Sequence, residues 1–336
     1  MLDIWNMISK LPIASNHKLQ LFGLIKRVGW YFKYDKEKYR FFVENQVFCN
    51  SNHYYGHEFW LKKYSRFPDK IYGIIEHGVY FGDNRTLVCP KEEWDTGSVI
   101  TYGDSRIDLL KELHPDKNVY AIGPRIHYAE TDMEYYDELY NQIDHTGKVL
   151  TIFPAHSLAE TKSIYDSELF LKQAEELANR IGAKTIMVSL HPSDFIHKLN
   201  LSFEGRKLIF VGGGTTPHKF LPRLRAVISI SDLTFSNRLG THIGYSVYMG
   251  VPHVLNTSSN MNARGNEAFE KEQSLFEKTF NGAEPLNITE EQRKLCDYYY
   301  GFSHIKTPGE LYNILVKCKN KFETKYYKKN SYALYI

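Results

Sequence analysis

Four histidines stand at or near the ends of apolar runs, where a proton acceptor or a phosphate contact would be useful. His77 follows the run KIYGIIE at residues 70–76, and His127, His156 and His191 lie near the ends of later runs. Imidazole titrates near pH 6.5, so it can take a proton from a hydroxyl group or offset the charge of a departing phosphate. A lone histidine is more often structural, but the repeated placement of four favours a functional site.

Carboxylates accompany two of these runs. Glu76 directly precedes His77, and Asp104 follows the run SVITY at residues 98–102. We expect His77 to be the catalytic base. Glu76 would orient its ring or raise its basicity, although neighbouring residues of an extended strand point in opposite directions. Asp83 and Asp104 remain rival bases.

The stretch SDLTFSNRLGTHIGYSVYMGVP, which starts at residue 231, has the pattern of a loop that leads into a helix. A helix N-terminus presents unpaired N–H groups to an anion, and nearby hydroxyl groups can add hydrogen bonds to a phosphate or a ribose. The alternative is an ordinary turn with helix capping. The candidate donor-binding residues here are Ser236, Asn237, Gly240, Thr241 and Ser246.

Three other loops supply the remaining candidates. Glycines let a backbone approach a base or a ribose closely, although a flexible turn would use them as well. These candidate donor-binding residues are His156, Ser157, His191, Pro192, Gly213, Gly214 and Thr215, and His191 is also a candidate for stabilising the leaving group.

The elements that must position these residues alternate between short apolar runs and helical patterns. We expect strands at residues 70–76, 98–102, 118–122, 148–153, 185–190, 207–211, 226–230 and 253–256. Helices are expected over 105–113, 132–145, 163–181, 218–225 and 240–249. This alternation predicts the α/β class with parallel, doubly wound sheets, in which ligands bind outside the carboxyl ends of the strands.

Length and composition limit the classes of protein that this chain can belong to. The length of 336 residues suggests two domains. The net charge of only +3, together with the lack of a recognisable nucleic-acid-binding module, argues against nucleic-acid binding. The four cysteines are scattered without a CxxC pair, so we expect no zinc site and a reducing cytoplasm. No signal peptide and no membrane-spanning run is recognisable.

Two features leave alternatives open. The 25 tyrosines suit stacking on sugar rings, but they also fit the composition of an AT-rich genome. The Lys- and Tyr-rich segment 317–329 can bind an anionic membrane surface peripherally or fray in solvent. The amphipathic segment 18–34 can likewise lie on a membrane or bury its apolar face.

Three motifs between about residues 70 and 255 resemble motifs of known enzyme families. The stretch 231–252 resembles the nucleotide-binding half of GT-B glycosyltransferases, where a Ser/Gly loop, a helix and a Gly-x-Pro step hold the donor. His191-Pro192 resembles the His-Pro motif of bacterial sialyltransferases and Kdo transferases, and also a step in CDP-glycerol glycerophosphotransferases. In those families the histidine contacts the donor phosphate.

The third motif is Glu76-His77-Gly78. It resembles the acidic-acidic-Gly motif of the sialyltransferases, with histidine in the second place, and equally the His-Gly motif of the glycerophosphotransferases, where the histidine is the proposed base. One departure weakens an assignment to the common UDP- or GDP-sugar families. Gly244-Tyr245-Ser246 stand where those families place an acidic ribose ligand.

The resemblance implies a GT-B-like fold of two Rossmann-like domains facing a central cleft. Residues 1–146 would form the acceptor domain, 147–316 the nucleotide-donor domain and 317–336 a basic aromatic tail. It implies an enzyme of bacterial polysaccharide, capsule or lipopolysaccharide assembly that acts in the cytoplasm or peripherally at the inner face of the cytoplasmic membrane. No obligatory cofactor or metal is expected, because no DxD motif stands near the strand ends.

The implied reaction is inverting transfer of a sugar from a nucleotide donor to a glycan or lipid-linked glycan acceptor. The His-Pro motif favours a CMP-linked sialic- or Kdo-like sugar slightly. The alternatives are a CDP-glycerol-type phosphotransferase, a UDP-sugar-dependent transferase or epimerase, and a carbohydrate- or nucleotide-binding module without catalysis.

Overall fold

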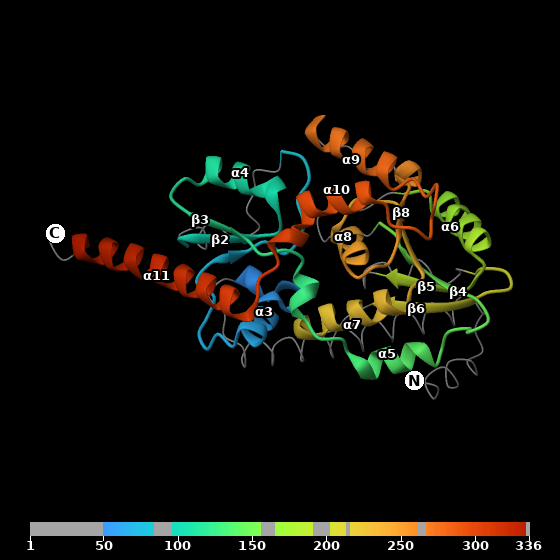
Figure 1. The fold of residues 1–336 in the computed structure, drawn as a ribbon, viewed down its shortest axis with the longest axis horizontal. Helices are drawn as coiled ribbons and strands as arrows, with labels where there is room; N and C mark the ends of the chain where they lie inside the picture. The colour runs from blue at the N-terminus through green and yellow to red at the C-terminus, as the bar shows by residue number, and fades with distance from the viewer. Residues whose placement is uncertain are drawn as a thin grey trace, which may run out of the picture.

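Parallel strands with helices packed on them form two bodies of the molecule. The computed structural model describes residues 50–83, 96–155, 165–190, 202–212, 216–260 and 267–333. Within these residues, a three-stranded and a five-stranded parallel sheet lie toward opposite ends of the molecule (Figure 1). The α/β class with parallel sheets is therefore confirmed.

The first sheet has the order β1-β2-β3 and is short. Its strands are β1 (Ile74–Ile75), β2 (Ser98–Thr101) and β3 (Asn118–Ala121). The strand expected over 70–76 shrinks to two residues, although the Glu76 N–H continues the pairing by donating to the Ile100 carbonyl at 3.0 Å. Helix α4 (Asp104–Leu113) lies on one face of this sheet (Figure 1).

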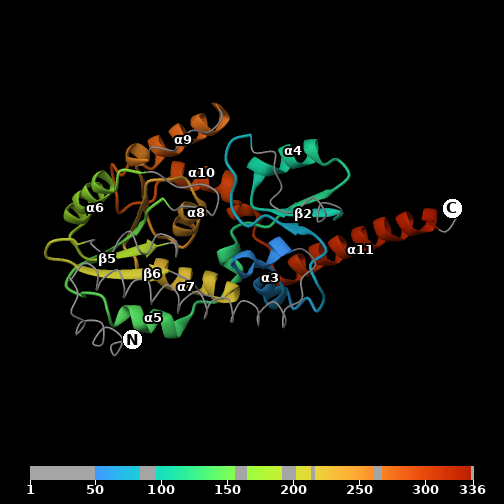
Figure 2. The ribbon, with the colours of Figure 1, turned by 180° about the vertical axis from the view of Figure 1, so that it is seen from behind.

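The opposite face of the first sheet is covered by segments from both ends of the described chain. Helix α3 (His57–Ser65) contributes Leu61, and helix α11 (Pro308–Ala333) contributes Leu311 and Leu315 to one core with Ile75 and Ile100. The predicted tail starts within α11. Its first residues still pack on the first half, where Cys318 is buried in the same core and Lys319 pairs with Asp69 at 2.6 Å. The last turns of α11 extend away from both sheets (Figure 2).

The second sheet has the strand order of a Rossmann fold. Its strands are β4 (Lys148–Phe153), β5 (Ala183–Leu190), β6 (Lys207–Gly212), β7 (Leu233–Ser236) and β8 (His253–Leu255), in the order β6-β5-β4-β7-β8. All neighbouring pairs are parallel. The order reverses between β4 and β7, and in such sheets the crevice beside the reversal is the usual ligand site.

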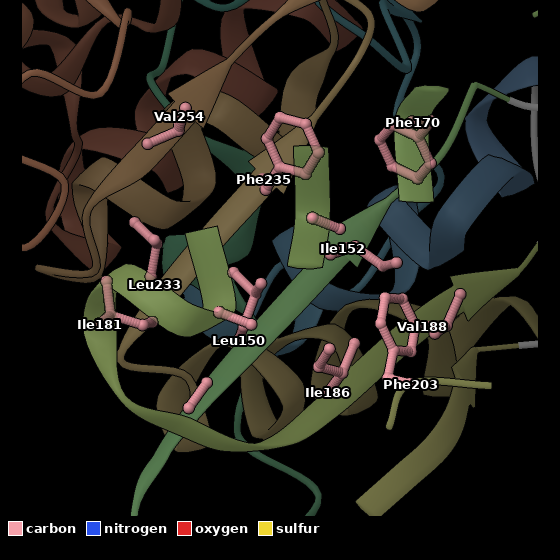
Figure 3. Packing of buried hydrophobic residues seen from close by; sticks show 13 residues of the cluster. Leu150, Ile152, Phe170, Ile181, Ile186, Val188, Phe203, Leu233, Phe235 and Val254 are labelled. Carbon is pink, nitrogen blue, oxygen red and sulfur yellow. The ribbon is translucent and has the colours of Figure 1, made fainter. Parts of the chain in front are cut away.

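Helices cover both faces of the second sheet because its strands are apolar on both sides. Helix α6 (Ser167–Ile181) packs Phe170 and Ile181 against Leu150 and Phe235 (Figure 3). It ends at Gly182, whose φ of 70° is the left-handed conformation that glycine favours. Helices α5 (Met133–Tyr140) and α7 (Pro217–Ile230) pack on the other face.

The strand expected at residues 226–230 is wrong, since these residues form the last turns of α7. The run AVISI is apolar on two sides because α7 lies between the second sheet and the first half. Val227 and Ile230 face the sheet, whereas Ile228 packs with Trp60 and Ile126. Burial on both sides hides the helical period, and the actual strand β7 follows.

Three further helices complete the second half. Helices α8 (Thr241–Tyr248), α9 (Glu267–Thr279) and α10 (Glu290–Tyr300) share a core with β8. After α10, the turn η6 (Phe302–His304) leads into α11 and back to the first sheet. The boundaries at residues 146 and 316 stay predictions. None of the helices described is both long and apolar enough to cross a membrane.

Candidate functional site

The loop after β1 docks on the N-terminus of α8. The Val79 N–H donates to the Thr241 hydroxyl oxygen at 3.2 Å, and a Cβ on Gly78 would lie 3.4 Å from the same oxygen. The Tyr102 hydroxyl lies 3.1 Å from that of Tyr245 on α8 and donates to the His77 carbonyl at 3.4 Å. These contacts bring His77 of the first half to the helix start of the second.

His77 lies in an aromatic environment. The Tyr80 hydroxyl is 3.5 Å from its Nδ1, and the rings of Tyr54 and Tyr55 have centroids 5.2 and 5.7 Å from the imidazole. Burial lowers the pKa of His77 from its ordinary 6.5 to about 4. The ring is therefore neutral at pH 7 and able to accept a proton, but it is a weaker base than an exposed histidine.

Glu76 points away from His77. Its carboxylate pairs with the Arg106 guanidinium at 2.5 Å and accepts from the Thr101 hydroxyl at 2.6 Å. All three side chains are buried. The alternation of the strand places consecutive side chains on opposite sides, so Glu76 anchors the end of the sheet and contacts Arg106 and Thr101 rather than the imidazole.

The other acidic candidates lie at different places. Asp104 is the first residue of α4, and its Oδ1 lies 2.9 Å from Nε2 of His304. Asp83 is exposed. His127 bridges the two halves instead, with Nδ1 2.5 Å from the Tyr248 hydroxyl on α8 and Nε2 3.3 Å from that of Tyr64 on α3.

Two predicted donor-binding residues hold neighbouring loops in place. Asn237 accepts a hydrogen bond from the Ala155 N–H at 2.7 Å and donates to the Ser259 hydroxyl at 3.1 Å. The Ser236 hydroxyl lies 3.0 Å from Nε2 of His253. Both side chains are fully buried, so their contribution is to fix the loop after β4 and the end of β7.

Helix α8 starts without a side-chain cap. Gly240 is its N-cap residue in extended conformation, and the Tyr300 hydroxyl donates to the Gly240 carbonyl at 2.8 Å. The starts of α3, α4 and α7 likewise have no side-chain cap, whereas Asp132, Asp166 and Thr289 cap the helices α5, α6 and α10. The Ile243 N–H donates to the Gly240 carbonyl at 3.3 Å, and Gly240 supplies no side-chain cap. A helix start of this kind can bind an anion.

Arg238 lies in the loop between β7 and α8, two residues before Gly240. The residue is exposed by surface area, although burial of part of its side chain lowers the pKa of its guanidinium. Among the described residues no carboxylate lies within ion-pair distance of it. Sequence reasoning missed it, although a basic residue between Ser236-Asn237 and Gly240 is a signal that could have been used. A cation so near Gly240 in the sequence could attract an anion in the same sense as the positive end of the helix dipole.

Two residues inside α8 are buried. The Ser246 side chain is fully inaccessible, and its hydroxyl has no hydrogen-bond partner among the described residues. A Cβ on Gly244 would collide with the ring of Tyr300. The glycine at the position of the absent acidic ribose ligand thus lets α10 pack closely on α8.

Seven predicted site residues lie outside the described residues. They are His156, Ser157, His191, Pro192, Gly213, Gly214 and Thr215. Among the residues that are described, no group of three or more His, Cys, Asp or Glu side chains is arranged to hold a metal ion.

Comparison with known proteins gives only distant likenesses. No protein-family model and no curated protein matches the chain. Among solved structures it is similar to the wall teichoic acid polymerase TagF, with 14% identity and a TM-score of 0.36 over 68% of this chain and 59% of that one. Two UDP-GlcNAc 2-epimerases are also similar. The one from Neisseria meningitidis has 18% identity and a TM-score of 0.33 over 66% of this chain and 59% of that one. The one from Methanocaldococcus jannaschii has 11% identity and a TM-score of 0.37 over 67% of this chain and 62% of that one.

The chain spans less than two thirds of the length of each of these structures. Likeness at this level does not assign a function.

Proposed function

We propose that the chain is a GT-B-type glycosyltransferase that moves a sugar from a nucleotide-activated donor to a hydroxyl group of an acceptor. The observation that supports this most is the contact between Val79 and Thr241. It joins a neutral imidazole, suited to accept a proton, to an uncapped helix start, suited to bind a phosphate.

The reaction follows from these two groups. The acceptor oxygen attacks the anomeric carbon while its proton passes to the neutral imidazole of His77. The bond between the anomeric carbon and the phosphate oxygen breaks, and the electron pair leaves with the nucleotide. The N–H groups of α8 and the guanidinium of Arg238 offset the charge that develops on the departing phosphate. A single displacement of this kind inverts the configuration at the anomeric carbon.

The donor class is the finer part of the proposal. The motif His191-Pro192 favours a CMP-linked acidic sugar, and a CDP-glycerol-type phosphotransfer would use the same helix start. Calorimetric titration of the full chain with CMP, CDP, UDP and GDP separates these donors. Tighter binding of UDP would remove the preference for cytidine nucleotides, and absence of binding of all four at millimolar concentration would overturn the function.

Arg238 gives a matched test of the phosphate site. Arg238→Met should weaken binding of the preferred nucleotide about 10-fold or more, since a charge-assisted hydrogen bond is lost. Arg66→Met is the control, because Arg66 is an exposed arginine at the end of α3. Equal affinity of the two variants would exclude Arg238 from the phosphate site.

A further inference from the structure

Two tyrosines form an exposed aromatic surface beside His77. Tyr54 and Tyr55 end the turn η1 (Asn50–Gly56), and they are 51% and 37% exposed. Both rings face the imidazole at centroid distances under 6 Å, and the Tyr55 ring also packs on Phe220 of α7 at 4.4 Å. Two adjacent exposed aromatic rings next to a candidate catalytic group offer a ligand a surface on which to stack.

The backbone that presents these rings is strained. Tyr55 has φ 57° and ψ 12°, a left-handed conformation that is uncommon for a large residue, and Gly56 follows with φ 73°. The second half holds this kink, because a Cβ on Gly56 would lie 2.5 Å from the Pro217 carbonyl oxygen. The Trp60 indole N–H also donates to the His218 carbonyl at 2.8 Å. Strain that the surrounding packing maintains is typical of functional sites.

A buried histidine next to the kink lacks hydrogen-bond partners. His57 is 1% exposed, its ring centroid is 5.8 Å from that of Tyr55, and neither ring nitrogen has a partner among the described residues. Burial holds its pKa well below the usual range, so the ring is neutral. An unsatisfied buried nitrogen costs free energy, so the surrounding packing must hold His57 beside Tyr55.

The side chains that face this surface carry no charge of their own. Behind it, Glu76 is paired with Arg106, and the buried Arg125 guanidinium donates to the Gly123 and Ile100 carbonyls. His77 and His57 are both neutral at pH 7. The ligand that fits is therefore neutral, flat on one face and rich in hydroxyl groups, which describes a pyranose ring better than a charged peptide or a phosphate.

We propose that Tyr54 and Tyr55 form the acceptor platform, on which a neutral pyranose ring stacks with one hydroxyl group directed at His77. This inference rests on the proposed function, because it assigns the acceptor of the same site. The C–H face of the sugar packs on the aromatic faces, and the tyrosine hydroxyls bind its hydroxyl groups.

Saturation-transfer NMR on the full chain tests the platform. The probes are the methyl β-pyranosides of galactose, glucose, N-acetylglucosamine and mannose at millimolar concentration, with and without CMP. We expect at least one to receive saturation on its ring C–H protons. Tyr54→Leu and Tyr55→Leu should reduce this signal about 5-fold or more, whereas Tyr54→Phe should keep it, because stacking needs the aromatic face.

The control is Tyr140→Leu, which changes a tyrosine of α5 that is 48% exposed and also lies beside a histidine, His145. It should leave the signal unchanged. Loss of signal counts only for variants whose thermal midpoint stays within a few degrees of the parent protein. The platform is overturned if no pyranoside receives saturation, or if the leucine variants and the control behave alike. The proposed function fails separately, through absent nucleotide binding, which these tyrosine variants should not alter.

Discussion

The Val79 N–H and the Thr241 hydroxyl oxygen are 3.2 Å apart, and this hydrogen bond ties the loop of His77 to the first turn of α8. Thr241 accepts in this bond, so its own O–H remains able to donate. A donor phosphate at the start of α8 can receive that O–H. Binding of the nucleotide and positioning of the base are then linked through one side chain.

Thr241→Val should therefore impair both functions. The valine is similar in shape but neither accepts from Val79 nor donates to a phosphate. We expect nucleotide affinity to fall about 10-fold, because a hydrogen bond to a charged group is lost, and the free energy of unfolding to fall by about 1 kcal/mol. Calorimetry and urea denaturation measure the two effects. Thr241→Ser should retain both properties, and a valine variant that binds nucleotide normally would contradict the link.

His77 should make turnover insensitive to pH across the neutral range. Burial lowers its pKa to about 4, so the folded protein keeps the ring neutral down to that pH. We expect the dependence of kcat/KM on pH to show no acid limb from His77 between pH 5 and 8. His77→Asn should lower kcat about 10²–10⁴-fold, the range for loss of a general base, while nucleotide affinity is preserved. An acid limb near pH 6.5 that disappears in the variant would show that the free imidazole titrates normally.

Glu76 should matter for stability rather than for proton transfer. Its carboxylate and the Arg106 guanidinium are buried together at 2.5 Å. Removing one partner leaves an uncompensated buried charge, so Arg106→Met should lower the free energy of unfolding by about 3–5 kcal/mol. The double variant Glu76→Leu with Arg106→Leu should recover much of this loss. Urea denaturation checks both. A Glu76→Gln protein with unchanged stability but abolished turnover would instead assign Glu76 to the chemistry.

The sequence predicts helices and strands best where an element has a regular apolar pattern and clear start or stop residues. The strand at residues 148–153 has the predicted bounds, and the helix that ends at Ile181 is stopped by Gly182 as expected. At residues 226–230 the prediction fails, because α7 is buried on two sides and its β-branched run resembles a strand. The return of α11 to the first sheet joins residues that are more than 200 positions apart, and no local pattern indicates it.

The candidate site was predictable only in part, for a related reason. Placing polar residues at strand ends identifies His77, Gly240 and Thr241, which the structure brings together. The same reasoning does not show on which side of the strand the Glu76 side chain lies. Nor does it show that the Asn237 side chain is already hydrogen-bonded to Ala155 and Ser259. Tyr54 and Tyr55 stand before the first predicted strand, where sequence gives no reason to expect contact with His77.

Glu58 should make the protein less stable as pH rises from 4.5 to about 7. It is 2% exposed, its Oε1 accepts from the Ile71 N–H at 3.0 Å, and Oε2 has no partner among the described residues. Burial raises its pKa from 4.5 to about 7. Between these values the folded protein binds more protons than the unfolded chain, so the free energy of unfolding decreases with pH by up to about 3 kcal/mol.

Glu58→Gln isolates this effect from the buried histidines. His57 and His253 have lowered pKa values, so they destabilise the folded protein as pH falls below about 6.5. This dependence on pH has the opposite sign to that of Glu58. The difference in free energy of unfolding between the variant and the parent should be constant below pH 4.5 and should grow in favour of the variant up to about pH 8. Urea denaturation at several pH values measures it. Glu176→Gln, a change at an exposed position of α6, should show no such growth, and a pH-independent difference for Glu58→Gln would mean that its carboxyl ionises normally in the fold.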